Sequence, residues 1–250
     1  MKILALIPAR MGSSRFPGKP MAPILGKPMV GHVYQRVAQC PLLTTTAVAT
    51  CDQIIVEYIE SIGGEAVMTS DEHVRASDRC AEAVSKLEAK LGLMYDIVVM
   101  VQGDEPMTHP GMIEEALQPM IDDPAVRIVN LLGEINSREE FMDRNCIKVV
   151  CNLQSEAMYF SREPIPTLSK VTDPPTGKQV CIIPFRRDFL TEYTVMEQTP
   201  LEIAEAVDMM RVLENGGSVR MVPTKYRTQS VDTESDLVFV EQLMSKAEFE

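Results

Sequence analysis

Three cations follow the first apolar run of the chain within ten residues. Arg10, Arg15 and Lys19 lie in the segment 8–20, interspersed with small residues. Small residues let backbone N–H groups approach a phosphate closely, while the cations neutralise its charge. The segment therefore predicts a loop that binds the phosphates of a nucleotide, with the small residues Gly12, Ser13, Ser14 and Gly18. A basic surface loop is the alternative, and the net charge of −12 disfavours it.

Two well-known phosphate-binding patterns are absent from this loop. It contains neither GxxxxGK[ST], which marks a P-loop ATPase, nor GxGxxG, which marks a dinucleotide-binding fold. The loop therefore gives poor support to P-loop ATPase chemistry and to dinucleotide cofactors.

Carboxylates follow two other apolar runs. Asp104 and Glu105 come just after the run 97–101, and Asp232 lies in a polar segment near the C-terminus. Magnesium is held by one or two carboxylates together with phosphate oxygens and water. We therefore predict Asp104 and Asp232 as Mg²⁺ ligands and assign Glu105 either a structural role or a role in supporting the metal ligands without binding the metal itself. For Asp232 the alternative is the N-cap of a C-terminal helix.

Apolar runs typical of strands alternate with amphipathic stretches typical of helices, which predicts an α/β fold with a mostly parallel sheet. In such sheets the ligand site lies beyond the carboxyl ends of the strands, where the cation loop and Asp104 both lie. A segment rich in proline, 163–178, predicts an irregular excursion from the sheet. The expected strands are 3–7, 45–49, 65–68, 97–101, 126–132, 147–151 and 218–222, and the expected helices are 28–39, 52–62, 77–91, 110–121 and 200–214.

Composition limits the class of protein. The 250 residues predict one domain over 1–250, and the charge of −12 argues against binding to nucleic acid or to an anionic membrane surface. The first apolar run is too short for the core of a signal peptide, and no stretch approaches the length of a membrane helix. Six cysteines without CxxC spacing indicate reduced thiols and hence a cytoplasmic protein.

Four motifs resemble those of the 3-deoxy-manno-octulosonate cytidylyltransferases, also called CMP-Kdo synthetases. They are Ile-Pro-Ala-Arg-Met-Gly-Ser-Ser-Arg-Phe-Pro-Gly-Lys-Pro (7–20), Val-Gln-Gly-Asp-Glu-Pro (101–106), Tyr-Phe-Ser-Arg (159–162) and Val-Asp-Thr-Glu-Ser-Asp (231–236). The resemblance implies a Rossmann-like, GT-A-like nucleotidyltransferase fold and Mg²⁺-dependent transfer of CMP from CTP to an acidic sugar. It also implies a homodimer that uses an excursion around 160–195, and a role in lipopolysaccharide biosynthesis.

The same resemblance implies roles for individual residues. Arg10, Lys19 and Asp104 are implied as catalytic. Binding of the nucleotide is implied for Pro8, Ala9, Arg10, Gly12, Ser13, Lys19, Ser77, Arg79 and Gln102. Binding of the acceptor is implied for Arg15, Arg162, Gln179, Ile183, Arg186, Asp208 and Met209.

The acceptor side departs from the family pattern. Where the family usually has His-Leu-Gly-Ile-Tyr-Gly-Tyr-Arg, residues 179–186 read Gln-Val-Cys-Ile-Ile-Pro-Phe-Arg, and Asp208-Met209 replaces Glu-Gln. The resemblance implies octulosonate or an analogue as the acceptor. A site built to bind particular hydroxyls rejects analogues that lack them, so the altered pocket predicts a preference for a different acid: a smaller or less hydroxylated one, a modified octulosonate or a hydroxyphosphonate. Arg162, Arg186 and Arg187 are the candidates to hold an anionic group of the acceptor, and the alternative for Arg186-Arg187 is an exposed charge pair.

Two other classes of protein compete with this interpretation. A nucleotide-sugar glycosyltransferase also combines an α/β sheet with a metal-binding carboxylate, but it usually carries an Asp-x-Asp pair where this chain has Asp104-Glu105. The second class is a non-catalytic nucleotide-binding protein, and the presence of both the cation loop and the two carboxylates argues against it. Neither class is favoured. No histidine is placed as an obvious general base.

Overall fold

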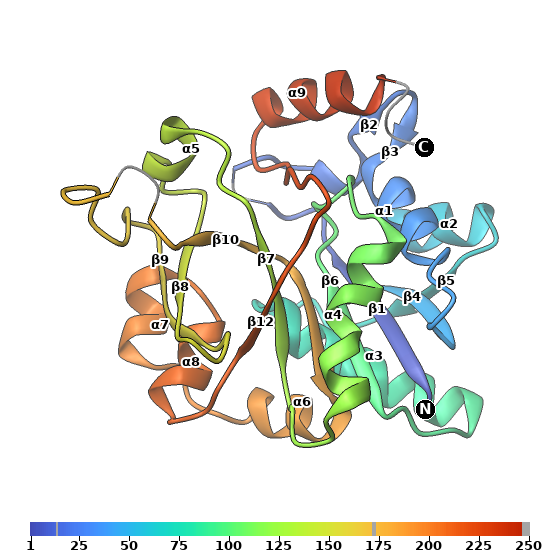
Figure 1. Ribbon diagram of the computed structural model, residues 1–250. Coiled ribbons are helices and arrows are strands. Elements are labelled where there is room, and N and C mark those ends of the chain that lie inside the picture. The colour runs from blue at the N-terminus through green and yellow to red at the C-terminus, as the bar shows by residue number, and fades with distance from the viewer. Residues whose placement is uncertain (14, 172–173, 247–250) are drawn as a thin grey trace. The chain divides into compact units, whose positions relative to one another are not determined.

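A computed structural model describes residues 1–13, 15–171 and 174–246 (Figure 1). The chain divides into two compact units. Unit 1 comprises Met1–Glu114 and Thr228–Glu250, and unit 2 comprises Glu115–Arg227. The sequence predicts one catalytic domain over 1–250, and that functional statement stays a prediction.

Unit 1 is built on a parallel sheet. Its central strand β1 (Ile3–Ala9) pairs with β4 (Thr45–Thr50) on one side and with β6 (Ile97–Val101) on the other, and β5 (Glu65–Met68) extends the sheet beyond β4. Every residue of β6 is buried, as expected for a central strand of a parallel sheet. Because β1 and β6 are parallel neighbours, their carboxyl ends lie at the same edge of the sheet. The connecting helices are α1 (Met29–Val37), α2 (Gln53–Ser61) and α3 (Ala76–Leu91).

Short elements complete unit 1. The 3₁₀ helix η1 (Lys19–Met21) and the strand pair β2 (Pro23–Ile24) and β3 (Lys27–Pro28) follow the cation loop, and α9 (Glu234–Met244) returns from the C-terminal part of the chain. These elements share an apolar cluster that includes Ile24, Met29, Met107, Val231, Val240 and Leu243. Burial of this cluster fixes the segment that carries Asp232 close to the cation loop.

Helix α9 begins with a capping box. The side chain of Thr233 accepts a hydrogen bond from the backbone N–H of Asp236, and Asp236 accepts one in return from the N–H of Thr233. Thr233 is therefore the N-cap, and the alternative that Asp232 caps this helix is wrong. The carboxylate of Asp232 is left for other partners.

Unit 2 contains a mixed sheet in the order β12-β7-β10-β8-β9. Strand β7 runs parallel to β12 and antiparallel to β10, and β8 is antiparallel to both β10 and β9. Residues 115–227 contain the strands β7 (Val129–Gly133), β8 (Lys148–Cys151), β9 (Ala157–Ser161), β10 (Gly177–Val180), β11 (Ile182–Arg186) and β12 (Arg220–Pro223), of which β11 is not part of the mixed sheet. The helices are α5 (Arg138–Met142), α6 (Arg187–Thr194), α7 (Pro200–Glu205) and α8 (Met209–Glu214). Helix α4 (Pro110–Asp122) begins in unit 1 and ends in unit 2.

The predicted fold class is confirmed, and one predicted element is wrong. The continuous helix expected over 200–214 is two helices, because Ala206 adopts a left-handed conformation with φ of 51°. The side chain of Arg162 donates to the carbonyls of Glu205 and Ala206 at the end of α7. Helical periodicity continues across the break, but these hydrogen bonds satisfy the carbonyl groups that a longer helix would have used.

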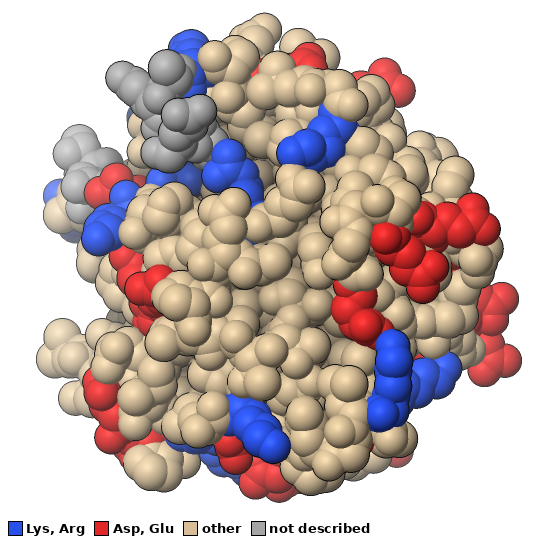
Figure 2. Space-filling model, turned by 90° about the vertical axis from the view of Figure 1, so that its right-hand side faces the viewer, with Lys and Arg blue, Asp and Glu red and all other residues tan. Residues whose placement is uncertain are grey.

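The charges on the surface and the state of the cysteines agree with what the composition predicts. On the face drawn in Figure 2, acidic side chains gather in patches, and lysines and arginines form a few separate groups. All six cysteines are free thiols. No helix among the described residues is both long enough and apolar enough to cross a membrane.

Candidate functional site

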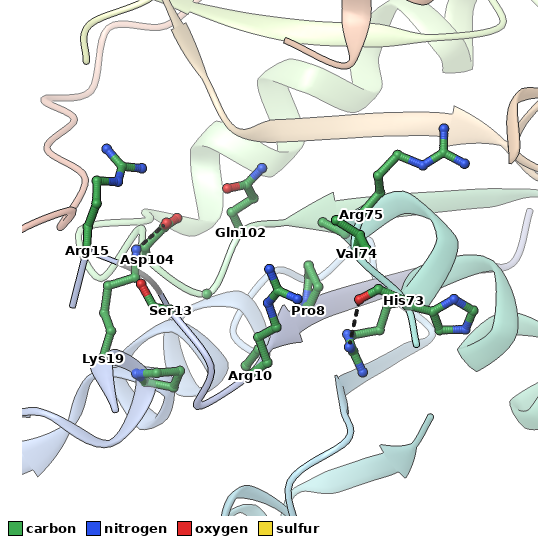
Figure 3. Close-up of a pocket in the computed structure, with 15 residues that line it drawn as sticks. Pro8, Arg10, Ser13, Arg15, Lys19, His73, Val74, Arg75, Gln102 and Asp104 are labelled. Carbon is green, nitrogen blue, oxygen red and sulfur yellow. Dashed lines mark hydrogen bonds and ion pairs between the residues drawn. The ribbon is translucent and has the colours of Figure 1, made fainter. Parts of the chain in front are cut away.

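A pocket of about 290 Å³ lies in unit 1, where β1 and β6 end. Figure 3 shows side chains from three segments around it: the cation loop, the residues after β6, and the segment that leads into α3. The lining residues are Pro8, Ala9, Arg10, Ser13, Arg15, Lys19, Pro20, His73, Val74, Arg75, Ala76, Arg79, Gln102, Gly103 and Asp104. The position agrees with the rule that α/β sheets bind ligands beyond the carboxyl ends of their strands.

The cation loop is held by hydrogen bonds at both ends. The backbone N–H of Met11 donates to the Asp52 carboxylate over 2.7 Å, and the N–H of Gly18 donates to the Met11 carbonyl over 3.0 Å. Gly18 has a φ of 76°, in the left-handed region that favours glycine. This turn places Lys19 at the start of η1. Ser14, which the sequence assigns to the same loop, lies outside the described residues.

Lys19 joins the two predicted metal ligands. Its Nζ lies 2.7 Å from Asp104 Oδ2 and 3.6 Å from Asp232 Oδ1, and it donates to the Val231 carbonyl over 2.8 Å. Arg15 Nη2 lies 2.9 Å from the same oxygen of Asp232. The fold thus brings together two carboxylates and two cations that come from three distant parts of the sequence.

This arrangement fits a hard divalent cation. The two carboxylates already share one positive charge, the ammonium of Lys19, and Mg²⁺ needs only one or two protein carboxylates when phosphate oxygens and water complete its shell. Among the described residues, no group of three or more His, Cys, Asp or Glu side chains is gathered to hold a metal without such help. Mg²⁺ therefore stays a prediction, and its site would need the phosphate oxygens of a nucleotide to complete it.

Gly103 lets two segments of the pocket approach closely. A Cβ atom at this position would lie 2.9 Å from the carbonyl oxygen of Pro8, a clash with backbone. Glycine therefore allows the chain after β6 to pass against the end of β1, with the half-buried Gln102 and Asp104 on either side. In Figure 3 the side chains of Arg10 and Gln102 stand in the middle of the pocket.

The segment that precedes α3, on the third side of the pocket, is held to that helix by hydrogen bonds. Arg79 is 2% exposed, and its guanidinium donates to the Thr69 hydroxyl and to the carbonyls of Ser70 and His73. One turn later, Glu82 accepts from the Ser70 N–H and from His73. Two residues of α3 therefore fix the segment 69–73, and its last residue, His73, begins the stretch 73–76 that lines the pocket.

The ionised state of Glu82 strengthens its hydrogen bonds to this segment. Burial opposes the ionised form of Glu82, but hydrogen bonds from Lys86, the Ser70 N–H and His73 outweigh it and lower the pKa of Glu82 to about 2. Glu82 is therefore a charged acceptor at neutral pH, and charge-assisted hydrogen bonds are stronger than neutral ones.

The structure places most of the predicted nucleotide-binding residues on the pocket. Pro8, Ala9, Arg10, Ser13, Lys19, Arg79 and Gln102 all line it. Gly12 and Ser77 are not among the lining residues, and Ser77 is fully buried in the first turn of α3. Contact with a nucleotide stays a prediction for each of these residues.

Of the predicted acceptor-binding residues, only Arg15 lies in unit 1, where it lines the pocket. Within unit 2, Arg162 donates to the carbonyls of Glu205, Ala206 and Arg144. Arg186 donates to those of Val126, Met120 and Asp123 around the end of α4. Both guanidinium groups therefore stabilise helix ends or loops. Arg186 is half-buried, so it is not the exposed charge that the sequence analysis gave as the alternative to an anion-binding residue.

The other four predicted acceptor residues also belong to unit 2. Ile183 and Met209 are 2% and 0% exposed, so both pack in the core. Gln179 Nε2 donates to the side-chain oxygen of the buried Asn130 over 2.7 Å. The carbonyl of Asp208 accepts from the Tyr193 hydroxyl. Acceptor binding by these residues stays a prediction, and the structure gives each of them a packing or hydrogen-bonding role.

Sequence reasoning missed part of the pocket. Pro20, His73, Val74, Arg75, Ala76 and Gly103 line it but were not among the predicted site residues. The position of residues 73–76 in the sequence could have identified them, because they immediately precede Ser77, a predicted nucleotide-binding residue, and lead into a helix. Gly103 was recognisable as a glycine directly between Gln102 and Asp104.

Comparison with known proteins identifies the family of this chain. The cytidylyltransferase family model matches residues 4–225 and so spans both units. The 3-deoxy-manno-octulosonate cytidylyltransferase of Geobacter metallireducens is 42% identical, over 98% of this chain and 99% of the relative. The protein of the same name from Geobacter sulfurreducens is also 42% identical, over 95% of this chain and 97% of the relative.

Solved structures give the same result. A CMP:2-keto-3-deoxy-manno-octonic acid synthetase complexed with CTP superposes with a TM-score of 0.89 at 37% identity, covering 98% of this chain and 99% of that one. A cytidylyltransferase from Leptospira borgpetersenii, at 16% identity and a TM-score of 0.65, covers 98% of this chain and 87% of that one and shows the shared fold. With a matching family model and full-length relatives above 40% identity, this chain belongs to the cytidylyltransferase family.

Proposed function

We propose that this chain transfers CMP from CTP to the hydroxyl of 3-deoxy-manno-octulosonate and releases pyrophosphate. The observation that carries this proposal is the convergence of a cation loop and two carboxylates on one pocket in unit 1. Relatives named for this activity match nearly the whole chain, and the similar solved structure contains CTP.

In this reaction the acceptor hydroxyl oxygen attacks the α-phosphorus of CTP. The bond from that phosphorus to the oxygen bridging to the β-phosphate breaks, pyrophosphate leaves, and the hydroxyl proton passes to solvent. Positioning and charge neutralisation carry most of the rate in such phosphate chemistry. Arg10 and Lys19 donate to the charge that develops on pyrophosphate, where one preorganised donor contributes roughly 10²–10³ in rate.

Asp104 and Asp232 are the proposed Mg²⁺ ligands. When bound, Mg²⁺ neutralises phosphate charge and acidifies the attacking hydroxyl. Lys19 supports this assignment because its ammonium is a cation that both carboxylates already share. Arg15, which pairs with Asp232 at the edge of the pocket, is the proposed partner of the acceptor carboxylate.

The alternative acceptors and reactions are not favoured. The full-length relatives carry the name of octulosonate rather than that of another acid, and the family model is that of cytidylyltransferases rather than of glycosyltransferases. We also propose a cytoplasmic homodimer that uses residues around 160–195. Six free cysteines support a reducing compartment, and exposed apolar side chains such as Val195, at 81%, support an interface in this range.

The test is pyrophosphate release with Mg²⁺ and each of the four nucleoside triphosphates. The acceptor panel contains octulosonate, its 8-amino analogue, a sialic-type acid and a simple hydroxyphosphonate. We expect release only with CTP, and fastest with octulosonate. Release with the hydroxyphosphonate but not with octulosonate would overturn the acceptor, and binding of CTP without release for any acid would overturn the enzyme assignment.

A further inference from the structure

Asp52 lies just after β4 and directly before α2, at the edge of the unit 1 sheet where β1 ends and the cation loop begins. It is the N-cap residue of this nine-residue helix, with an extended backbone at φ −109° and ψ 117°. Aspartate is favoured at this position because its carboxylate accepts a hydrogen bond from an N–H of the first helical turn. The side chain of Asp52 accepts no such bond from α2, all of whose residues the structure describes. Asp52 is therefore an N-cap residue that does not cap its own helix.

The carboxylate of Asp52 binds the cation loop instead. Its Oδ2 accepts from the Met11 N–H over 2.7 Å, and this N–H belongs to the peptide group that joins Arg10 to Met11. Because a peptide group is planar, the bond fixes the direction in which Arg10 leaves the backbone, toward the middle of the pocket (Figure 3). The Met11 carbonyl in turn accepts from the N–H groups of Ser13 and Gly18, over 2.9 and 3.0 Å. Asp52 thus holds the residue at which the loop closes.

This use of the carboxylate has two disadvantages. A negative charge beside a phosphate-binding loop repels the ligand, and charges near a protein surface interact more strongly than charges in bulk water. The chain also loses the stabilisation that a side-chain cap would give to α2. Sequence rules that fail in this way are expected at functional sites, so the bond from Met11 to Asp52 indicates a role in function.

We propose that Asp52 is a positioning residue, whose carboxylate holds the cation loop in the conformation that binds the triphosphate. The proposal rests on the proposed CTP site. A loop that is already fixed binds more tightly, because less conformational freedom is lost when the ligand arrives. A carboxylate suits this role since a backbone N–H forms a stronger hydrogen bond with an ionised oxygen than with a neutral one. Asp52 is not among the described residues that line the pocket, so it acts through Met11 and Arg10.

The test measures binding of CTP and of inorganic tripolyphosphate by calorimetry, with Mg²⁺ present. Asp52→Ser keeps a favoured N-cap residue, but the shorter side chain does not reach Met11. We expect the Kd for both ligands to rise about tenfold, the loss of one charge-assisted hydrogen bond. Charge alone predicts the opposite, because removing a carboxylate would strengthen the binding of an anion. Unchanged or tighter binding in Asp52→Ser would overturn the proposal.

Stability separates this role from a purely structural one. A serine cap on α2 offsets the lost bond to the loop, so the thermal midpoint of Asp52→Ser should stay within about 2 °C of the wild type. Asp52→Asn keeps an oxygen at the same reach without the charge, and it should retain both affinities to within about threefold. A loss in Asp52→Asn as large as that in Asp52→Ser would contradict the proposal, because the hydrogen bond would then not be what positions the loop.

Asp96→Ser is the matched control. Asp96 Oδ2 also accepts a backbone N–H, that of Lys2 over 2.6 Å, but at the opposite end of β1. This variant should leave both Kd values unchanged. The wild type separates the two proposals: if it binds neither ligand, the proposed function fails, whereas if it binds both and Asp52→Ser binds them equally well, only the role of Asp52 fails.

Discussion

At the scale of single residues, Asp104 is the carboxylate on which the proposed chemistry depends most. It lies three residues after the end of β6, and its Oδ2 is 2.7 Å from Lys19 Nζ. The asparagine side chain has the same shape but no charge, so it binds a hard cation poorly and leaves the Lys19 ammonium less compensated. The same shape should preserve the fold.

We expect Asp104→Asn to lower the rate of pyrophosphate release by at least about 10²–10³-fold at saturating CTP. His109→Ala is the comparison, because His109 Nδ1 accepts a hydrogen bond from the Gly111 N–H at the start of α4 and has no place in the proposed reaction. That variant should keep turnover within a few-fold of the wild type. Full activity in Asp104→Asn would rule out the metal assignment.

At the scale of elements, α7 and α8 are joined by a buried ion pair. Arg211 and Glu202 have side chains that are 0% and 3% exposed, and two guanidinium nitrogens of Arg211 donate to the carboxylate. Arg211 also donates to the Tyr193 and Met196 carbonyls, which ties the end of α6 to the same point. Removing one charge leaves the other buried without compensation.

We expect Glu202→Gln to lower the free energy of unfolding by about 3–5 kcal/mol, measured by urea denaturation. Glu192→Gln is the matched control, because Glu192 pairs with Arg127 at a site where both side chains are about half exposed. That change should cost less than about 1 kcal/mol. Equal losses for the two variants would mean that burial does not govern the strength of the Arg211–Glu202 pair.

At the scale of the whole molecule, the family resemblance predicts a dimer that uses residues around 160–195. Light scattering should then give a mass of twice the 27.8 kDa chain. Val195 follows α6 and is 81% exposed, and a charge placed there would be buried without a partner if the interface covers it. We expect Val195→Arg to shift the mass toward that of one chain.

The control for this experiment is Val238→Arg on α9, outside the predicted interface, where the wild-type side chain is 55% exposed. It should leave the mass unchanged. A single-chain mass for the wild type would contradict the predicted dimer, and dissociation by Val238→Arg alone would place the interface elsewhere.

Much of this molecule follows from local sequence. The buried strands β1 and β6, the cation loop and Asp104 were all predictable, because burial on both faces of a parallel strand produces an unbroken apolar run and the site residues follow such runs directly. Gly18, which the sequence assigns to the loop, stands where a left-handed turn favours glycine, whereas the need for glycine at Gly103 became visible only from the close approach of the Pro8 carbonyl.

Partners distant in the sequence were decided only by the tertiary structure. Lys19 donates to the carbonyl of Val231, 212 residues away in the sequence, and both Lys19 and Arg15 pair with Asp232. In unit 2, the guanidinium groups of Arg162 and Arg186 donate to backbone carbonyls. A charged side chain carries no local signal of its partner, because long-range packing determines which oxygen or carboxylate comes within reach. The sequence thus determined which segments carry the chemistry, and the folded chain determined which charges meet.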